Sequence, residues 1–155
     1  MEYVQQTVRD IISRPARTVA PEMTLGDLLR LFSSHDLDAY PVVRGEKLVG
    51  IVSKADSIKP FTAKVATKAL DRDAIMGTTV EQIMSPAIVT VKLEATLGQV
   101  LELLAAYDFV SFPVVDRENH VAGIVALDDL VRALAQSTWR TSPPLDLRPV
   151  GYAIA

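Results

Sequence analysis

Cysteine is absent from this chain of 155 residues, and its absence removes several kinds of chemistry at once. Without thiols there is no disulfide, no thiolate metal site and no cysteine nucleophile. The sequence also lacks a run of about 18 consecutive apolar residues, the length that a membrane-spanning helix needs. Its start, MEYVQQTVRD, has neither the basic nor the apolar segment of a signal peptide. These absences predict a cytoplasmic protein that does not enter a membrane.

An excess of positive charge is missing too, and histidine is scarce. Lys and Arg number 16 against 19 Asp and Glu, and the net charge of -3 leads us to expect no nucleic-acid partner. His35 and His120 are the only histidines, and we find no set of metal ligands around either. Nucleophile-elbow, Walker and dinucleotide-binding glycine motifs do not occur. We expect no enzyme activity, no catalytic residue, no bound metal and no required cofactor.

The strongest signal present is an internal repeat. Residues Val8–Val43 align with Val80–Val115 without a gap, at an offset of 72 residues. One extra residue then enters, so that Gly50 matches Gly123 at an offset of 73. Because insertions are tolerated in loops, this residue predicts a longer turn between two strands of the second copy.

Each copy predicts the same order of elements. Thr7 and Thr79 precede brief helices, and Thr24 and Thr96 precede longer ones with apolar residues at helical spacing. A strand with β-branched residues lies between the two helices of each copy. A hairpin and a last helix follow. The predicted strands are residues 17–19, 39–43 and 47–52 in the first copy, and 88–91, 111–115 and 120–125 in the second.

The unit is therefore β-α-β-β-α, and the predicted fold class is α/β (α+β). A small sheet with helices on one face leaves its other face uncovered, so we expect two units to pack sheet to sheet with pseudo-twofold symmetry. The expected boundaries are 7–58 for the first repeat, 59–78 for the segment between repeats, 79–136 for the second repeat and 137–155 for a C-terminal tail of undetermined role.

Both copies resemble CBS repeats, the cystathionine beta-synthase type, and the whole chain resembles a free-standing tandem pair. The resemblance rests on Thr-Leu at the start of the longer helix, an aromatic residue before Pro-Val-Val, and Gly-Ile-Val followed by Asp. These residues lie at 24–25, 40–43 and 50–56, and again at 96–97, 112–116 and 123–129. The resemblance implies a regulatory pair with two clefts that bind AMP, ADP, ATP or S-adenosylmethionine, and it implies a homodimer.

The cleft motif of the family, Gly, apolar, any, Ser or Thr, any, any, Asp, is complete in the first copy. At a helix N-terminus Ser53 can donate to a phosphate, Asp56 can accept from ribose hydroxyls, and Gly50 allows close approach of the backbone. Apolar side chains would form walls for a base. The implied first site comprises Thr18, Tyr40, Pro41, Gly50, Ile51, Ser53 and Asp56. Ser-x-x-Asp is also a capping box that needs no ligand, and both interpretations can hold together.

The second copy departs from the motif, because Ala126 replaces the serine while Asp129 remains. An Asp kept without its hydroxyl partner favours ribose recognition over capping. The implied second and weaker site comprises Thr90, Phe112, Pro113, Gly123, Ile124 and Asp129. It holds a nucleoside-like ligand, binds ATP weakly, or is empty.

The sequence thus predicts a sensor that binds an adenine nucleotide or another adenosyl ligand and alters an unidentified partner protein, a function suited to energy sensing. A ligand-free scaffold that dimerises or docks on a partner protein is the alternative.

Overall fold

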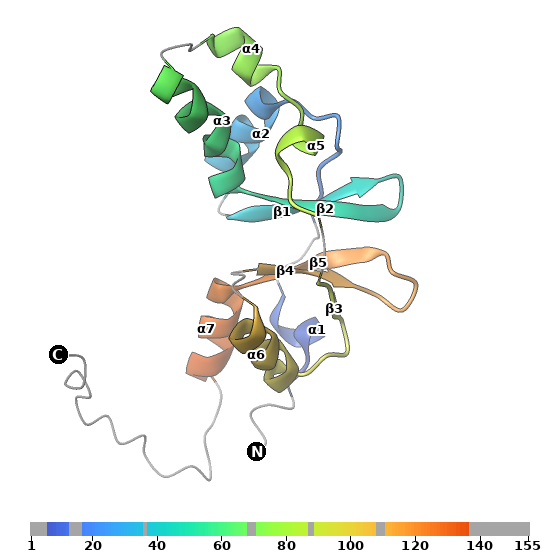
Figure 1. The fold of residues 1–155 in the computed structure, drawn as a ribbon. Helices are drawn as coiled ribbons and strands as arrows, with labels where there is room; N and C mark the ends of the chain where they lie inside the picture. The colour runs from blue at the N-terminus through green and yellow to red at the C-terminus, as the bar shows by residue number, and fades with distance from the viewer. Residues whose placement is uncertain are drawn as a thin grey trace, which may run out of the picture.

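The computed structural model describes residues 6–12, 17–35, 37–67, 71–86, 89–107 and 111–136. It has two lobes, each a small sheet with helices on its outer face, and the two sheets face each other (Figure 1). This arrangement confirms the predicted fold class. The predicted tail, 137–155, lies outside the described residues.

The first lobe is built on one hairpin, in which β1 (Ala39–Arg44) pairs antiparallel with β2 (Lys47–Ser53). Strands have a side-chain period of two, so Tyr40, Val42 and Val52 share one face, and all three are fully buried. They pack against the helices of the lobe. These are α2 (Leu25–Ser34), α3 (Lys54–Thr67), α4 (Arg72–Met76) and α5 (Val80–Ile83).

The second lobe repeats the hairpin with a third strand added. Its sheet has the order β3-β4-β5, with β3 (Val91–Lys92) parallel to β4 (Ser111–Val115), and β4 antiparallel to β5 (Val121–Ala126). The buried face again packs on helices, here α6 (Leu97–Ala106) and α7 (Leu127–Gln136).

The predicted caps of the longer helices are confirmed. Thr24 Oγ1 accepts from the Asp27 N–H at 3.2 Å, and Thr96 Oγ1 accepts from the Gln99 N–H at 3.2 Å. Gln99 completes a capping box by accepting from the Thr96 N–H at 2.9 Å.

The predicted first strand of the first copy is nearly lost. Within residues 17–20 only Val19 pairs with β1, through a single parallel bridge to Val42. The Val19 N–H donates to the Pro41 carbonyl at 3.0 Å, and the Val43 N–H donates to the Val19 carbonyl at 2.9 Å. The turn at Pro21 follows two residues later, so this strand has no length over which to extend.

The two short helices exchange lobes. The first one, α1 (Val8–Ile11), packs in the core of the second lobe, where the Val8 N–H donates to the Ala95 carbonyl at 2.8 Å. Its counterpart α5 packs in the first lobe, where the Val80 N–H donates to the Met23 carbonyl at 2.8 Å. The reciprocal exchange relates the lobes by pseudo-twofold symmetry, so the lobes do not coincide with the contiguous repeats.

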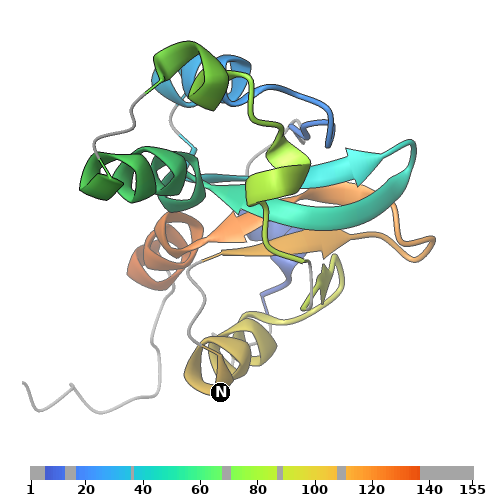
Figure 2. The ribbon, with the colours of Figure 1, turned by 45° about the horizontal axis from the view of Figure 1, so that its top comes forward.

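The two hairpin turns differ in length, as the inserted residue predicts. The first is a two-residue turn in which Gly45 has φ +65°. The second spans residues 116–120, with Asn119 at φ +65°, and the N–H groups of Glu118 and His120 donate to Asp116 Oδ1 at 2.8 and 2.9 Å. These bonds, chiefly that from His120, lower the pKa of Asp116. Figure 2 shows both turns extending from the same side of the molecule.

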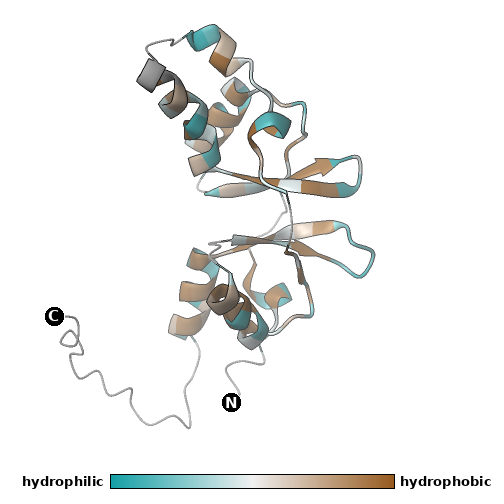
Figure 3. Cartoon of the chain, in the orientation of Figure 1, coloured by the Kyte–Doolittle hydropathy of each residue, from teal (hydrophilic) through white to brown (hydrophobic). Residues whose placement is uncertain are grey.

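Hydrophobic residues gather on the strands and the inner helix faces, whereas the hairpin turns are hydrophilic (Figure 3). Two core clusters result, one in each lobe. Among the described helices, none has the length and apolar character needed to cross a membrane.

Candidate functional site

The first turn of α3 brings Ser53 and Asp56 together. The Asp56 N–H donates to Ser53 Oγ at 3.1 Å, and the Ser53 N–H donates to Asp56 Oδ2 at 2.9 Å, which forms a complete capping box. Lys59 Nζ lies 3.1 Å from Asp56 Oδ1. Asp56 is only 6% exposed, so its carboxylate is held in one orientation at the junction of strand and helix.

The second lobe keeps this arrangement without a hydroxyl. The Ala126 N–H donates to Asp129 Oδ2 at 2.9 Å, and Arg132 Nη1 lies 3.4 Å from Asp129 Oδ1. The interpretation that Asp129 lacks a capping partner is therefore wrong, because half of the capping box needs only the backbone N–H of residue 126. The survival of Asp129 does not by itself indicate ribose recognition.

Gly50 allows a close approach, but the approaching group belongs to the chain itself. A Cβ atom on Gly50 would lie 2.6 Å from Met84 Sδ and 2.7 Å from the Ser85 carbonyl oxygen. The backbone of Ile51 pairs with Ser85 through two hydrogen bonds of 2.9 Å. Gly50 therefore has an internal packing role in this structure.

Tyr40 and Phe112 do not form walls of an open cleft. They are 0% and 1% exposed, and both belong to the cores on the helix side of their sheets. The Tyr40 ring lies against Phe32, with centroids 5.1 Å apart. Among the described residues no group bonds the buried Tyr40 hydroxyl, whose pKa burial raises. Both rings are therefore committed to the cores of their lobes.

The face of each sheet that points away from its core carries the other predicted strand residues. Pro41 is the register partner of Ile51, and Ser53 is the partner of Ala39, so period two places all four on the face away from the core. In the second lobe the same face carries Pro113, Ile124 and Ser111. Since β1 and β5 are in contact across the interface, these residues face the region between the lobes.

Two predicted threonines lie before the sheets. Thr18 is exposed, and it precedes Val19, whose N–H donates to the Pro41 carbonyl. Thr90 is exposed too, and it lines a cavity of about 530 Å³ at the hairpin turns. Gly123 is buried on β5, at the position equivalent to Gly50.

Sequence reasoning missed Ala39, Ser111 and an ion pair beside the first site. The alternation of strand residues around Pro41 was the signal that assigns Ala39, and not Tyr40, to the inter-lobe face. Lys54 Nζ lies 3.3 Å from Asp38 Oδ1, and the Lys54 N–H donates to the Asp38 carbonyl at 2.9 Å. This pair depends on the meeting of two strand ends, for which the sequence contains no local pattern.

Residues 8–56 and 80–136 match the model of the CBS domain. The CBS domain-containing protein YhcV of Bacillus subtilis is 31% identical over 124 residues, covering 80% of this chain and 82% of that protein. Two crystal structures, each 26% identical with a TM-score of 0.69, cover 84% of this chain. One is CBSX2 in complex with AMP, of which 97% is covered. The other is the CBS domain pair of MJ0100 in complex with 5′-methylthioadenosine and S-adenosyl-L-methionine, of which 96% is covered.

Proposed function

This chain belongs to the CBS domain family, and from that premise we propose that it is a non-catalytic sensor that binds an adenosyl ligand between its lobes. The ligand classes are AMP, ADP, ATP and S-adenosylmethionine. Support comes from the two similar pairs whose structures contain AMP or S-adenosyl-L-methionine with 5′-methylthioadenosine.

One structural observation carries the proposal, the buried carboxylate that recurs at the strand-to-helix junction of each lobe. Asp56 and Asp129 are each 6% exposed and each held by the backbone N–H three residues before it. Each oxygen of the Asp56 carboxylate offers two acceptor positions, so its contacts with the Ser53 N–H and with Lys59 leave capacity for the hydroxyls of a ribose. Each carboxylate also adjoins the strand face directed at the other lobe.

We assign phosphate recognition to the first junction. Ser53 ends β2 and Lys54 begins α3 there, and Lys59 lies five residues further along the helix. A helix N-terminus with a hydroxyl and ammonium groups attracts an anion. The second junction has Ala126 in place of the serine, so it favours a ligand with fewer phosphate contacts or binds the same ligand more weakly.

The walls of the site are the inter-lobe strand faces. Pro41 and Ile51 from the first lobe, with Pro113 and Ile124 from the second, supply apolar surface for a flat base. This assignment replaces Tyr40 and Phe112 as the contacts with the base.

We also propose a homodimer formed through α3 and α7. Their large apolar side chains Ile58, Val65, Leu127 and Val131 are 44 to 64% exposed. Both helices lie on the same side of the molecule in the two ribbon views (Figures 1 and 2). An apolar surface shared by two adjacent helices suits a second copy of the same surface.

A thermal-shift series tests ligand binding. We expect AMP, ADP, ATP or S-adenosylmethionine at 1 mM to raise the melting temperature, because a ligand at about 100 times its Kd stabilises the folded state by roughly 2.7 kcal/mol. Asp56→Asn should reduce the shift, whereas Asp73→Asn, an exposed acid in the first turn of α4, should not. Equal shifts in both variants would contradict the assigned site.

A ligand-free scaffold is the second candidate, and a specific observation favours it. The capping box and the contact of Gly50 with Met84 give these motif residues structural roles without any ligand. An unchanged melting temperature with all four ligands, in a protein that still dimerises, would support the scaffold.

A further inference from the structure

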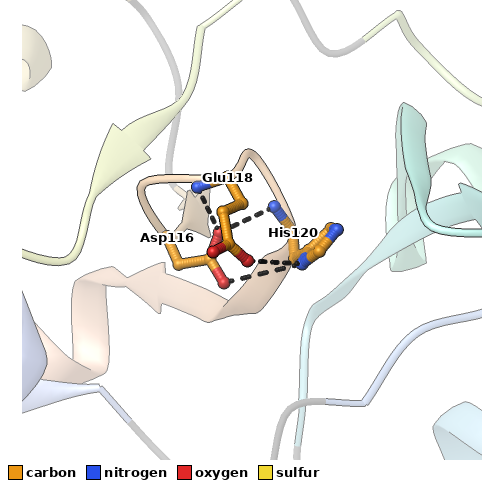
Figure 4. A group of neighbouring side chains, drawn as sticks. All are labelled: Asp116, Glu118 and His120. Carbon is orange, nitrogen blue, oxygen red and sulfur yellow. Dashed lines mark hydrogen bonds and ion pairs between the residues drawn. The ribbon is translucent and has the colours of Figure 1, made fainter.

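The turn between β4 and β5 gathers three side chains of metal-binding type. Asp116, Glu118 and His120 each offer one ligand atom, and these atoms lie within 4.8 Å of one another (Figure 4). This placement corrects the expectation that no ligand set surrounds His120. The signal was local, since Asp116 and Glu118 stand four and two residues before the histidine.

The distances suit a small divalent ion. His120 Nδ1 lies 3.5 Å from Glu118 Oε2 and 3.8 Å from Asp116 Oδ2. A tetrahedral ion bound at roughly 2.1 Å sets its ligands roughly 3.4 Å apart. The two distances from His120 Nδ1 are close to that spacing, and all three ligand atoms lie within 4.8 Å of one another.

A residue of the other lobe orients the imidazole. Glu46, in the first hairpin turn, places Oε2 3.3 Å from His120 Nε2. A carboxylate that accepts from one ring nitrogen fixes the tautomer in which the other nitrogen can bind a metal. Nδ1 is then the ligand atom, and it is the nitrogen that faces Asp116 and Glu118.

The electrostatics also call for a cation. Among the residues that the structure describes, no Lys or Arg pairs with Asp116, Glu118 or Glu46. Two nearby cations are partly engaged with other groups: Lys92 Nζ donates to Asn119 at 2.7 Å, although its charge also acts on Asp116, and Arg117 lies 3.7 Å from Glu94. The carboxylates of Glu46, Asp116 and Glu118 surround His120, so this turn attracts positive charge, which a bound metal ion can supply.

The site is also accessible. The cavity of about 530 Å³ between the two hairpin turns is lined by Glu46, Glu118 and His120. It has room for an entering ion and for the water that completes a four-coordinate shell.

We propose that Asp116, Glu118 and His120 bind a divalent transition metal ion, with Zn²⁺ as the best match to one imidazole and two carboxylates. Glu46 is a positioning residue for His120. Because Glu46 belongs to the first lobe and the ligands to the second, the bound ion also ties the two hairpin turns together. The site lies away from the strand-to-helix junctions assigned to the adenosyl ligand.

Titration of the untagged protein with Zn²⁺, monitored by calorimetry, tests this proposal. The visible absorption of bound Co²⁺ provides a second readout of the same site. We expect one saturable site per chain. His120→Ala and Glu118→Gln should each weaken it at least tenfold, and Glu46→Gln should weaken it about tenfold. His35→Ala is the matched control and should leave the affinity unchanged.

Asp116→Asn provides a check on folding, since its amide oxygen keeps the two backbone bonds of the turn while the charge is lost. It should stay folded, as circular dichroism can show, and bind Zn²⁺ at least tenfold more weakly. Absence of saturable Zn²⁺ binding by the wild type overturns the proposal. Binding that His120→Ala leaves undiminished overturns it equally.

Discussion

Gly50 shows how a residue that matches a ligand motif can also serve the fold. Its missing side chain makes room for Met84 and Ser85, where the beginning of the second repeat pairs with β2. The sequence identified Gly50 correctly as a position of close approach, but it contained no information on which group approaches.

Gly50→Ala should therefore destabilise the protein even without ligand. The new Cβ would lie 2.7 Å from a backbone carbonyl oxygen, and such overpacking costs roughly 1–3 kcal/mol. Chemical denaturation measures this change in the free energy of unfolding. The control is Gly26→Ala in α2, where the nearest atom would be 3.6 Å away and the variant should be neutral or more stable. A neutral Gly50→Ala would contradict the packing role.

Asp129 has a structural role that the sequence pattern does not reveal. A capping box is defined in sequence as a pair of side chains. With Ala126 in place of the serine, that definition leaves Asp129 without a structural reason. In the structure the backbone N–H of Ala126 is a sufficient hydrogen-bond partner for the Asp129 carboxylate. Backbone donors are present at every position except proline, which is why no sequence pattern marks this contact.

At the scale of elements, the helices and hairpins were predictable because each has a local cause. Thr24 and Thr96 start helices with apolar stripes, and Gly45 reverses the chain between two β strands. The placement of α1 was not predictable from its own residues. A four-residue helix has too little surface to specify which of two similar lobes it packs against. Tertiary contacts therefore determine the position of α1.

The exchange of α1 and α5 predicts reciprocal effects on local stability. Val8→Ala should raise amide hydrogen exchange in α6 and β4 of the second lobe, and Val80→Ala should raise it in α2 and β1 of the first. Both valines are fully buried, so each change should cost roughly 1–3 kcal/mol. If Val8→Ala loosened the first lobe and left the second protected, the exchange of helices would be contradicted.

At the scale of the whole molecule, the repeat made the pairing of two lobes predictable, because two sheets with uncovered faces must bury them together. The inter-lobe strand faces around Pro41 and Pro113 follow from the same repeat. The contact between Glu46 and His120 does not follow from the repeat. It joins two turns that lie 74 residues apart in sequence, one of which contains the inserted residue.

The proposed dimer makes a prediction for the assembled protein. Val131→Glu places a charge on the most exposed of the large apolar residues of α7 and should weaken dimerisation at least tenfold, measured by analytical ultracentrifugation. Tyr107→Glu is the control, because this exposed residue at the end of α6 lies outside the proposed surface. A monomeric wild type, or equal effects of the two changes, would contradict the α3–α7 interface.

The most direct measurement of the central claim is calorimetric titration of the purified protein with AMP, ADP, ATP and S-adenosylmethionine in turn, beside the Asp56→Asn variant. The asparagine keeps an acceptor for the Ser53 N–H, so the helix start is preserved while the charged acceptor is lost. We predict saturable binding of at least one ligand by the wild type. We also predict affinity reduced tenfold or more in the variant, since a hydrogen bond to a charged group contributes roughly 1.5–3 kcal/mol. No heat with any of the four ligands, from protein that circular dichroism shows to be folded, would contradict the sensor and leave the scaffold.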